Sequence, residues 1–437
     1  MSAQPVAEPV AAIAAIAVDA GALPLGGGLL ALLRPALGRL QPGGALALLS
    51  SSKSTAQDLP AWCRLERHEY LGGAPLPDGR HQHLIRRGPH GVPAPRLPAP
   101  RLDGATPAAA AAPAGEPRPP GLPPRTRDLM AQVPPPARAD PDSGFAPRGA
   151  SVEPGGPPYP FTLLARDQVM PPETAELYEQ AVAAQWDPGR DIPWHKAGRL
   201  PPAMAQALAQ VMTFLAENEL SALYVPSRFL ARLHPAYAEV AMLLAAQLAD
   251  EARHIDVFLK RAALLGVGLG VSSATTALSL RTLLAYDDFV EASFMLSVLG
   301  EGTFLDLLRF VEEQAPDEAT AEIARRARAD EARHVRFGLC HVRHALVADP
   351  TLVTRLEQAV RRRAAVMTGG GIPAPVQDAF TLLAARGDHP ADVARGHDAF
   401  RALLETMQRN RQRRLAAAGF SNEQAAHLSA LHTPNFM

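Results

Sequence analysis

The five-residue word Asp-Glu-Ala-Arg-His occurs twice in this chain, and no other feature of the sequence constrains the fold as strongly. Both copies lie in stretches whose apolar residues recur at helical spacing. In the first copy Glu251 and His254 are three positions apart, as are Glu331 and His334 in the second. Residues at this spacing share one face of a helix, so each copy presents a carboxylate beside an imidazole.

The neighbours of Glu251 indicate that this face is buried. Its stripe of the helix is otherwise apolar and includes Leu244, Leu248, Ile255 and Phe258. A buried carboxylate without compensation costs several kcal/mol or more, and a cation is a natural partner. A single Glu-x-x-His pair would more often lie on a solvent-exposed helix face. Two copies within an identical five-residue sequence favour a metal site instead.

Helical apolar spacing predicts four long helices in succession, a pattern typical of a helical bundle, and two or three further helices after them. The first four are expected over residues 202–230, 236–265, 276–313 and 319–348, and the later ones over 351–367, 374–386 and 391–418.

Two more acids are candidates to complete a pair of metal sites. Glu301 is isolated on the apolar face of the third expected helix, with Ser297 as its one small polar neighbour. On the first helix the choice lies between Glu219, which shares its face with apolar residues, and Glu217; Glu219 is preferred. Each half of the bundle then contributes a Glu and, about thirty residues later, a Glu-x-x-His pair, as antiparallel helices require.

A proline-rich segment divides the chain into two parts. About half of the 43 prolines lie between Gly88 and Pro160, and such a composition cannot bury enough apolar surface to order itself. The expected organisation is a small α/β module over residues 1–87, a disordered linker over 88–158 and a helical domain over 159–437. The fold class is therefore α+β overall, with a four-helix bundle and extra helices in the C-terminal domain.

The N-terminal module resembles the TusA-like sulfur-carrier fold over roughly residues 10 to 87. The resemblance rests on the phrase LQPGGALALLSSSKSTAQDLPAWCRLERHEYLG, in which a Pro-Gly turn precedes a strand. Family members that carry persulfide do so on a cysteine before the first helix, where this chain reads Leu25-Gly26-Gly27-Gly28. Sulfur transfer of the usual kind is therefore not expected, and Cys63 is interpreted as a packed small hydrophobe.

Residues 160 to 437 resemble the ferritin-like di-iron carboxylate family, whose oxygenase and desaturase branches share the Asp-Glu-x-Arg-His signature. The resemblance implies two iron ions, with a mixed manganese/iron pair also compatible with these residue types. It further implies that Asp250 and Asp330 each hydrogen-bond the histidine of the opposite word, with Arg253 and Arg333 in an outer ion-pair layer.

Several members of this superfamily lack a counterpart here. The radical-storing tyrosine of ribonucleotide reductase would stand at Phe258, and the additional histidine of arylamine N-oxygenases would stand at Ala327. The chain also lacks the cysteine-rich iron site of rubrerythrins. N-oxygenation therefore remains open without specific support.

The functional hypothesis is a non-haem di-iron oxygenase or oxidase acting on a small-molecule or carrier-bound substrate. Glu219 and His254 would hold one metal, Glu301 and His334 the other, and Glu251 and Glu331 are the expected bridges. Because no flavin or nicotinamide fingerprint is visible, an external electron donor such as a ferredoxin or reductase is expected. The alternative is a ferroxidase that handles iron without an organic substrate.

The composition of the chain limits the classes of partner and the location that we expect. With 43 Lys and Arg against 44 Asp and Glu, the net charge of -1 gives no reason to expect a nucleic acid or a membrane surface as partner. The longest uncharged run, 262–280, is interrupted by glycines and serines and is not expected to span a membrane. Two distant cysteines fit a cytoplasmic location, and a homodimer is left open.

Overall fold

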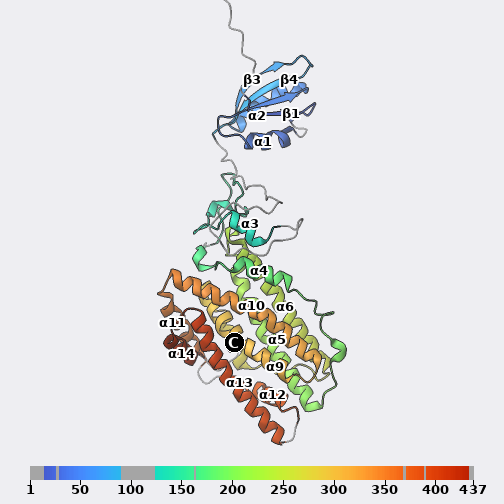
Figure 1. The fold of residues 1–437 in the computed structure, drawn as a ribbon, viewed down its shortest axis with the longest axis vertical. Helices are drawn as coiled ribbons and strands as arrows, with labels where there is room; N and C mark the ends of the chain where they lie inside the picture. The colour runs from blue at the N-terminus through green and yellow to red at the C-terminus, as the bar shows by residue number, and fades with distance from the viewer. Residues whose placement is uncertain are drawn as a thin grey trace, which may run out of the picture. The chain divides into compact units, whose positions relative to one another are not determined.

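The computed structural model describes residues 14–25, 29–89, 124–161, 164–367, 371–387 and 390–432, and the chain divides into two compact units (Figure 1). The first comprises Met1–Leu122 with Gly149–Glu153, and the second comprises Pro123–Arg148 with Pro154–Met437. The first unit carries a small four-stranded sheet and the second is helical. The chain is thus mainly helical with one small sheet.

The first unit alternates strands and helices. Its elements are β1 (Ile16–Asp19), α1 (Leu29–Gly38), β2 (Ala45–Ser50), α2 (Lys53–Leu65), β3 (Glu69–Pro75) and β4 (His81–Arg86). The sheet order is β1-β2-β4-β3, with β1 and β2 parallel and the other pairs antiparallel. The parallel pair needs a crossover connection, which α1 supplies. The small α/β module predicted here is present, while its likeness to sulfur carriers stays a prediction.

Cys63 belongs to the apolar core of this unit and is fully buried beside residues such as Leu59 and Ile85. Burial raises the pKa of its thiol to about 12, so the reactive thiolate is not formed at neutral pH. These observations agree with its interpretation as a packed side chain. Gly26, Gly27 and Gly28 lie outside the described residues.

Residues 124–158 differ from the predicted linker without structure. They include the short helix α3 (Thr126–Gln132), and Arg148 forms an ion pair of 2.6 Å with the buried Glu239. The same guanidinium donates to the carbonyl oxygens of Val133 and Ala236. The composition of this segment does not predict that Arg148 is held in place, because Glu239 and Ala236 lie about ninety residues later in the chain. Residues 90–123 of the predicted linker lie outside the described part.

The helical unit contains more elements than the spacing predicts. Its helices are α4 (Thr174–Ala183), α5 (Pro202–Leu230), α6 (Ala238–Leu264), α7 (Ala274–Leu283), α8 (Phe289–Ser293), η7 (Phe294–Glu301), α9 (Gly302–Gln314), α10 (Glu318–Ala348), α11 (Leu352–Val366), α12 (Ala374–Ala385), α13 (Pro390–Ala417) and α14 (Asn422–Leu431). The four predicted bundle helices correspond to α5, α6, the run from α8 to α9, and α10. Helices α5 and α6 pack together, as do α9 and α10, and α6 also contacts α10.

The prediction of one helix over residues 276–313 is wrong, because the structure divides it. Helix α7 ends at Leu283, and a new helix begins at Phe289, where the Asp288 carboxylate accepts hydrogen bonds from the amides of Val290 and Glu291. From there the chain is helical to Gln314, but residues 294–301 form a π-helix, η7, that ends at Glu301. Such wider turns are frequent at functional sites.

Two apolar cores fill the helical unit, and the candidate site falls between them. On α5, Leu215 belongs to one core and Ala222 to the other, with Glu219 between them. On α6, Leu244 belongs to one core and Val257 to the other, and Glu251 lies between them. The acids therefore stand in a polar layer enclosed by apolar packing on both sides.

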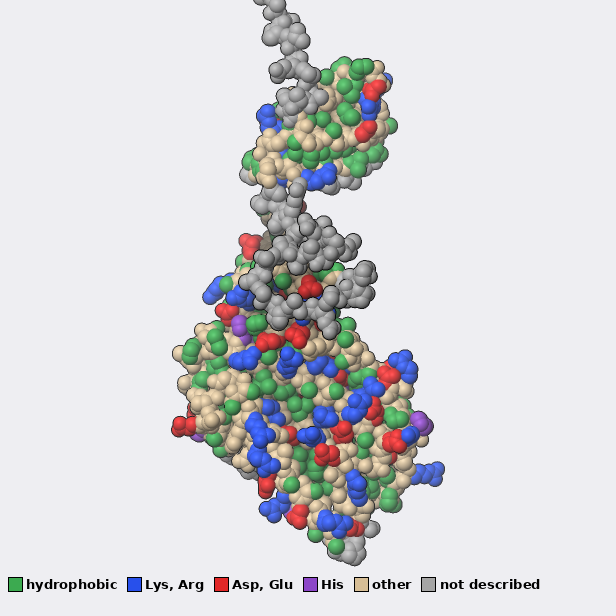
Figure 2. Space-filling model, viewed as in Figure 1, with side chains coloured by type: hydrophobic (Ala, Val, Ile, Leu, Met, Phe, Trp, Pro, Cys, Tyr) green, Lys and Arg blue, Asp and Glu red, His purple; other side chains and the backbone are tan. Residues whose placement is uncertain are grey.

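Charges of both signs are mixed on the visible face of the helical unit (Figure 2). On the face drawn in Figure 2, Lys and Arg side chains are interspersed with Asp and Glu on the helical unit. Among the described residues, no helix has both the length and the apolar character needed to cross a membrane.

Candidate metal centre

Six buried side chains from four elements converge in the polar layer. Glu219 comes from α5, Glu251 and His254 from α6, Glu301 from the end of η7, and Glu331 and His334 from α10. None of the six is more than 3% exposed. They form two groups in which the candidate ligand atoms all lie within 4.8 Å of one another: Glu219, Glu251, His254 and Glu331, and Glu251, Glu301, Glu331 and His334.

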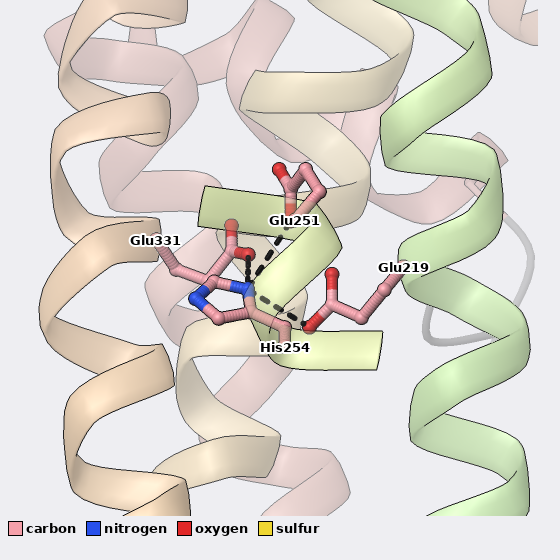
Figure 3. Close-up of side chains that lie close together, drawn as sticks. All are labelled: Glu219, Glu251, His254 and Glu331. Carbon is pink, nitrogen blue, oxygen red and sulfur yellow. Dashed lines mark hydrogen bonds and ion pairs between the residues drawn. The ribbon is translucent and has the colours of Figure 1, made fainter. Parts of the chain in front are cut away.

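The first group is arranged around one imidazole nitrogen (Figure 3). His254 Nδ1 lies 3.4 Å from Glu219 Oε1, 3.2 Å from Glu251 Oε2 and 3.4 Å from Glu331 Oε1. One nitrogen facing three carboxylates leaves a space that an ion bound by all four residues could occupy.

The second group repeats this arrangement with the other imidazole. His334 Nδ1 lies 3.0 Å from Glu251 Oε1 and 3.4 Å from Glu331 Oε2. Glu301, at the end of η7, is the fourth member of this group. Glu251 and Glu331 belong to both groups and turn one carboxylate oxygen toward each histidine, which is the placement that a bridging carboxylate requires.

The donor atoms of this cluster fit a pair of divalent cations. Buried carboxylate oxygens without a hydrogen-bond partner include both oxygens of Glu219 and of Glu331 and Oε2 of Glu301. Buried polar atoms are seldom left in this way. Four carboxylates with two neutral imidazoles carry four negative charges, which two divalent ions would neutralise. The residues present could therefore hold two metal ions.

Ionisation in the absence of a cation leads to the same conclusion. Burial raises the pKa of Glu219 and of Glu301 well above its ordinary range, and the neighbouring carboxylates add to this. Burial would lower the pKa of His254 and His334, but the surrounding carboxylates outweigh it and raise the pKa of both rings. Without a cation, these carboxyl and imidazole groups therefore hold protons. A metal ion that binds here would displace those protons, because ligands must be deprotonated to bind a metal.

An outer layer of two Asp and two Arg residues orients the imidazoles. His254 Nε2 lies 3.2 Å from Asp330 Oδ2 and His334 Nε2 lies 3.2 Å from Asp250 Oδ2, so each ring meets the aspartate of the opposite word. Arg253 and Arg333 each pair with both aspartates. The layer is internally neutral, and it turns Nδ1 of each ring toward the carboxylates.

Two partners of this layer were not predicted. Trp186 Nε1 donates to Asp330 Oδ2 at 2.7 Å, and the guanidinium carbon of Arg253 lies 5.2 Å from the indole centroid. Gln185 Nε2 donates to Asp250 Oδ1 at 3.1 Å. Both residues follow α4 in an irregular segment without periodicity, so the sequence offers no signal that would place them.

Two further polar contacts could have been found from the sequence. Gln247 Nε2 donates to Glu301 Oε1 at 3.1 Å, and Gln247 stands four positions before Glu251 on the same helix face. Ser297 stands four positions before Glu301 on the same helical run and opposes the rise in the pKa of Glu301. A polar residue one turn before a predicted ligand is therefore a useful sign of a supporting contact.

An apolar crevice adjoins the cluster beside Gln247 and Ser297. Its other lining residues come from α5, α6, α8, η7 and α10 and are mainly apolar: Val225, Pro226, Phe229, Leu244, Phe289, Ala292, Ser293, Leu296 and Phe337. Its free volume of about 10 Å³ is roughly the room for one water molecule. A larger surface hollow of about 560 Å³ lies around Arg190 and Glu318, and none of the six clustered residues lines it.

The remaining candidates lie elsewhere. Glu217 is half-buried and accepts a hydrogen bond from Ser272 instead of joining either group. His341 is buried between Phe289 and Phe337, where its Nε2 lies 2.7 Å from the Gln168 carbonyl oxygen. His344 and His195 also lie outside the two groups.

No protein-family model matches the sequence, and no curated protein matches it. Among solved structures, a variant of an R2-like ligand-binding oxidase with an aerobically reconstituted Mn/Fe cofactor has 17% identity and a TM-score of 0.44, covering 56% of this chain and 93% of that one. A variant with an anaerobically reconstituted Mn/Fe cofactor has 18% identity and one with an Fe/Fe cofactor 16%, with the same coverage and TM-score. At these values the likeness does not establish a shared activity, which must rest on the chain's own residues.

Proposed function

We propose that the helical unit is a di-metal oxidoreductase of the oxygenase type, which uses dioxygen to oxidise an organic substrate in the cytoplasm. The observation that carries this proposal is the pair of buried groups sharing Glu251 and Glu331, with unpartnered donor atoms directed into one space. Carboxylate-rich ligation with only two histidines suits iron or manganese better than zinc or copper. Two iron ions are the proposed cofactor, with a manganese/iron pair as the second choice.

Each residue has a defined task in this proposal. Glu219 with His254, and Glu301 with His334, would each hold one ion at its outer side, while Glu251 and Glu331 would bridge the two. When bound, the metal pair would supply the electron transfer to dioxygen that side chains cannot provide. The protein contributes ligand geometry, a water-poor cavity and imidazoles held by Asp250 and Asp330.

The apolar crevice supports an organic substrate over free iron as the species oxidised. It reaches Ser297 and also Gln247, which donates a hydrogen bond to Glu301, and its other walls are apolar except for Ser293. A crevice of this size admits a substrate only if side chains such as Phe229 or Phe337 move. We infer a small or carrier-bound substrate with an apolar portion that enters here.

Electrons are proposed to come from a separate ferredoxin or reductase. We also propose that the N-terminal unit presents a partner or substrate to the helical unit. Deleting residues 1–87 should then reduce turnover with the true partner and leave the metal content unchanged. Unchanged turnover would show that this unit has no presenting role.

The deciding experiment mixes anaerobically Fe(II)-loaded protein rapidly with dioxygen and follows visible absorbance, with iron per chain measured on the same sample. Close to two irons and a transient visible band would support oxygen activation at a di-iron site. Negligible iron and no transient would rule out the di-iron proposal.

A ferroxidase is the competing function, and oxygen consumption separates the two. Oxygen uptake that depends on an organic substrate would support the oxygenase. Oxidation of added Fe(II) with sustained mineral formation, unaffected by organic compounds, would favour the ferroxidase instead.

A further inference from the structure

Buried basic side chains gather on the side of α9 that faces α13. We call Arg411 and Arg414 of α13, together with His432 just beyond α14, the arginine cluster. Arg411 is 6% exposed and His432 is 5% exposed, and the side chain of Arg414 is 12% exposed. None of the three belongs to the candidate metal centre.

Among the described residues, the cluster has less negative charge nearby than its arginines require. Asp306 of α9 accepts hydrogen bonds from Arg414 Nη1 at 3.2 Å and from Asn410 Nδ2 at 2.7 Å. The structure gives Arg411 no ion pair within the described residues. Arg414 therefore has one carboxylate partner, which Asn410 also engages, and Arg411 has none among the described residues.

Several donor atoms of the cluster are buried without a partner. They are Arg411 Nε, Arg414 Nε and Nη2, and His432 Nε2. Arg363 of α11 adds a third positive charge nearby, although its own donors reach Thr282 and Ser279. Burial, followed by the charges of Arg411, Arg363 and Arg414, holds the pKa of His432 well below its ordinary range.

The backbone of α9 is adapted to this cluster. Arg414 lies against Gly302, where an added Cβ would stand 2.6 Å from Arg414 Nε. A side chain at residue 302 would therefore displace the guanidinium. Burial also lowers the pKa of Arg411 to about 10, so at neutral pH the buried group stays charged and needs a counter-ion.

We propose that the arginine cluster is a binding site for one oxyanion, a phosphate or a carboxylate group, held by Arg411 and Arg414 beside His432. Guanidinium groups match the planar, multidentate geometry of these anions. The neutral imidazole of His432 can donate one N–H to the same anion. The bound group would supply the charge that Asp306 alone does not.

The test measures anion binding to the full-length, metal-loaded chain by isothermal titration calorimetry and thermal unfolding. Inorganic phosphate, acetate and chloride are compared at constant ionic strength. We expect phosphate or acetate to bind and raise the Tm, and the stronger of the two identifies the class of anion. Arg411→Gln should weaken that binding by about ten- to a hundredfold, because a hydrogen bond to a charged group is lost.

Arg413→Gln is the matched control, because Arg413 is an exposed residue of the same helix. It should bind the anion as the wild type does. Arg411→Met guards against a folding defect: in oxyanion-free buffer it should be at least as stable as the wild type, since it removes an uncompensated buried charge, whereas with phosphate the wild type should be the more stable.

Three results would overturn the proposal. The first is that neither phosphate nor acetate binds the wild type. The second is that chloride raises the Tm as much as they do, which would indicate general screening. The third is that Arg411→Gln and Arg413→Gln respond alike.

Discussion

The charge of the candidate metal centre leads to a prediction that the effect of Glu301→Gln on stability depends on whether metal is bound. Glu301 is 1% exposed, and its Oε2 has no partner. Without metal, the raised pKa of Glu301 means that this acid takes up a proton when the chain folds at neutral pH, a cost that the neutral amide of Gln avoids. The cost avoided is about 1.4 kcal/mol for each pH unit by which the pKa is raised, up to neutral pH. For a unit of this size, about 1 kcal/mol shifts the Tm by roughly 2–4 °C, so the metal-free variant should unfold a few degrees above the wild type.

With metal the stability advantage of the variant should shrink by about 1.4 kcal/mol or more. A cation that binds only the folded state stabilises it by about 2.7 kcal/mol at a hundredfold excess over Kd, and the wild type should gain this in full. The variant lacks one charged ligand of the second group, so its metal affinity should fall at least about tenfold, the consequence of losing roughly 1.4 kcal/mol of binding. Mn(II) is the preferred probe, because it is not oxidised during the experiment.

The assay is thermal unfolding with chelator and with excess Mn(II), combined with the metal content per chain. Glu217→Gln is the matched control, since Glu217 stands on α5 outside both groups, and it should follow the wild type in both buffers. A variant destabilised equally with and without metal would refute the reasoning, because Glu301 would then act only in packing.

Three further outcomes are expected. Asp250→Asn and Asp330→Asn should each lower metal affinity about 10- to 100-fold, measured as metal retained after dialysis, because both orient an imidazole; full retention in both would contradict this. Trp186→Phe should cost about 1–3 kcal/mol in chemical denaturation by leaving Asp330 without its indole donor, and an unchanged midpoint would refute it. Burial lowers the pKa of His341 to about 4, below the ordinary 6.5, so the unfolded chain binds more protons between these values. Stability should therefore fall as pH drops from 6.5 to 4, by about 3 kcal/mol for this group, and His341→Gln should remove that part of the pH dependence.

Much of the fold follows from local periodicity. The bounds of α5 and α10 agree with the predicted helices to within a residue, because each is a long, uninterrupted amphipathic stretch. The division between α7 and α8 was missed, since apolar spacing continues across Asp287 and Asp288 and only the cap shows the break. The π-helix before Glu301 likewise leaves no mark in the apolar pattern.

The acids that converge could be named from the sequence, because a carboxylate on an apolar stripe must find a partner. The choice between Glu219 and Glu217 was less certain. They stand two positions apart on one helix and so point in different directions, and the packing of α5 against α6 turns Glu219 toward the cluster. Sequence spacing can rank such candidates, while the rotation of the helix selects one.

The sequence alone named the side chains available for chemistry: two Glu-x-x-His pairs, two isolated acids, and an aspartate directly before each pair. Only the tertiary structure decided which groups from distant segments meet them. Trp186 and Gln185 reach the outer layer, Gln247 reaches Glu301, and the arginine cluster assembles behind Gly302. The physical reason is that periodicity records which face of an element is buried, whereas contacts across the fold depend on how those buried faces pack.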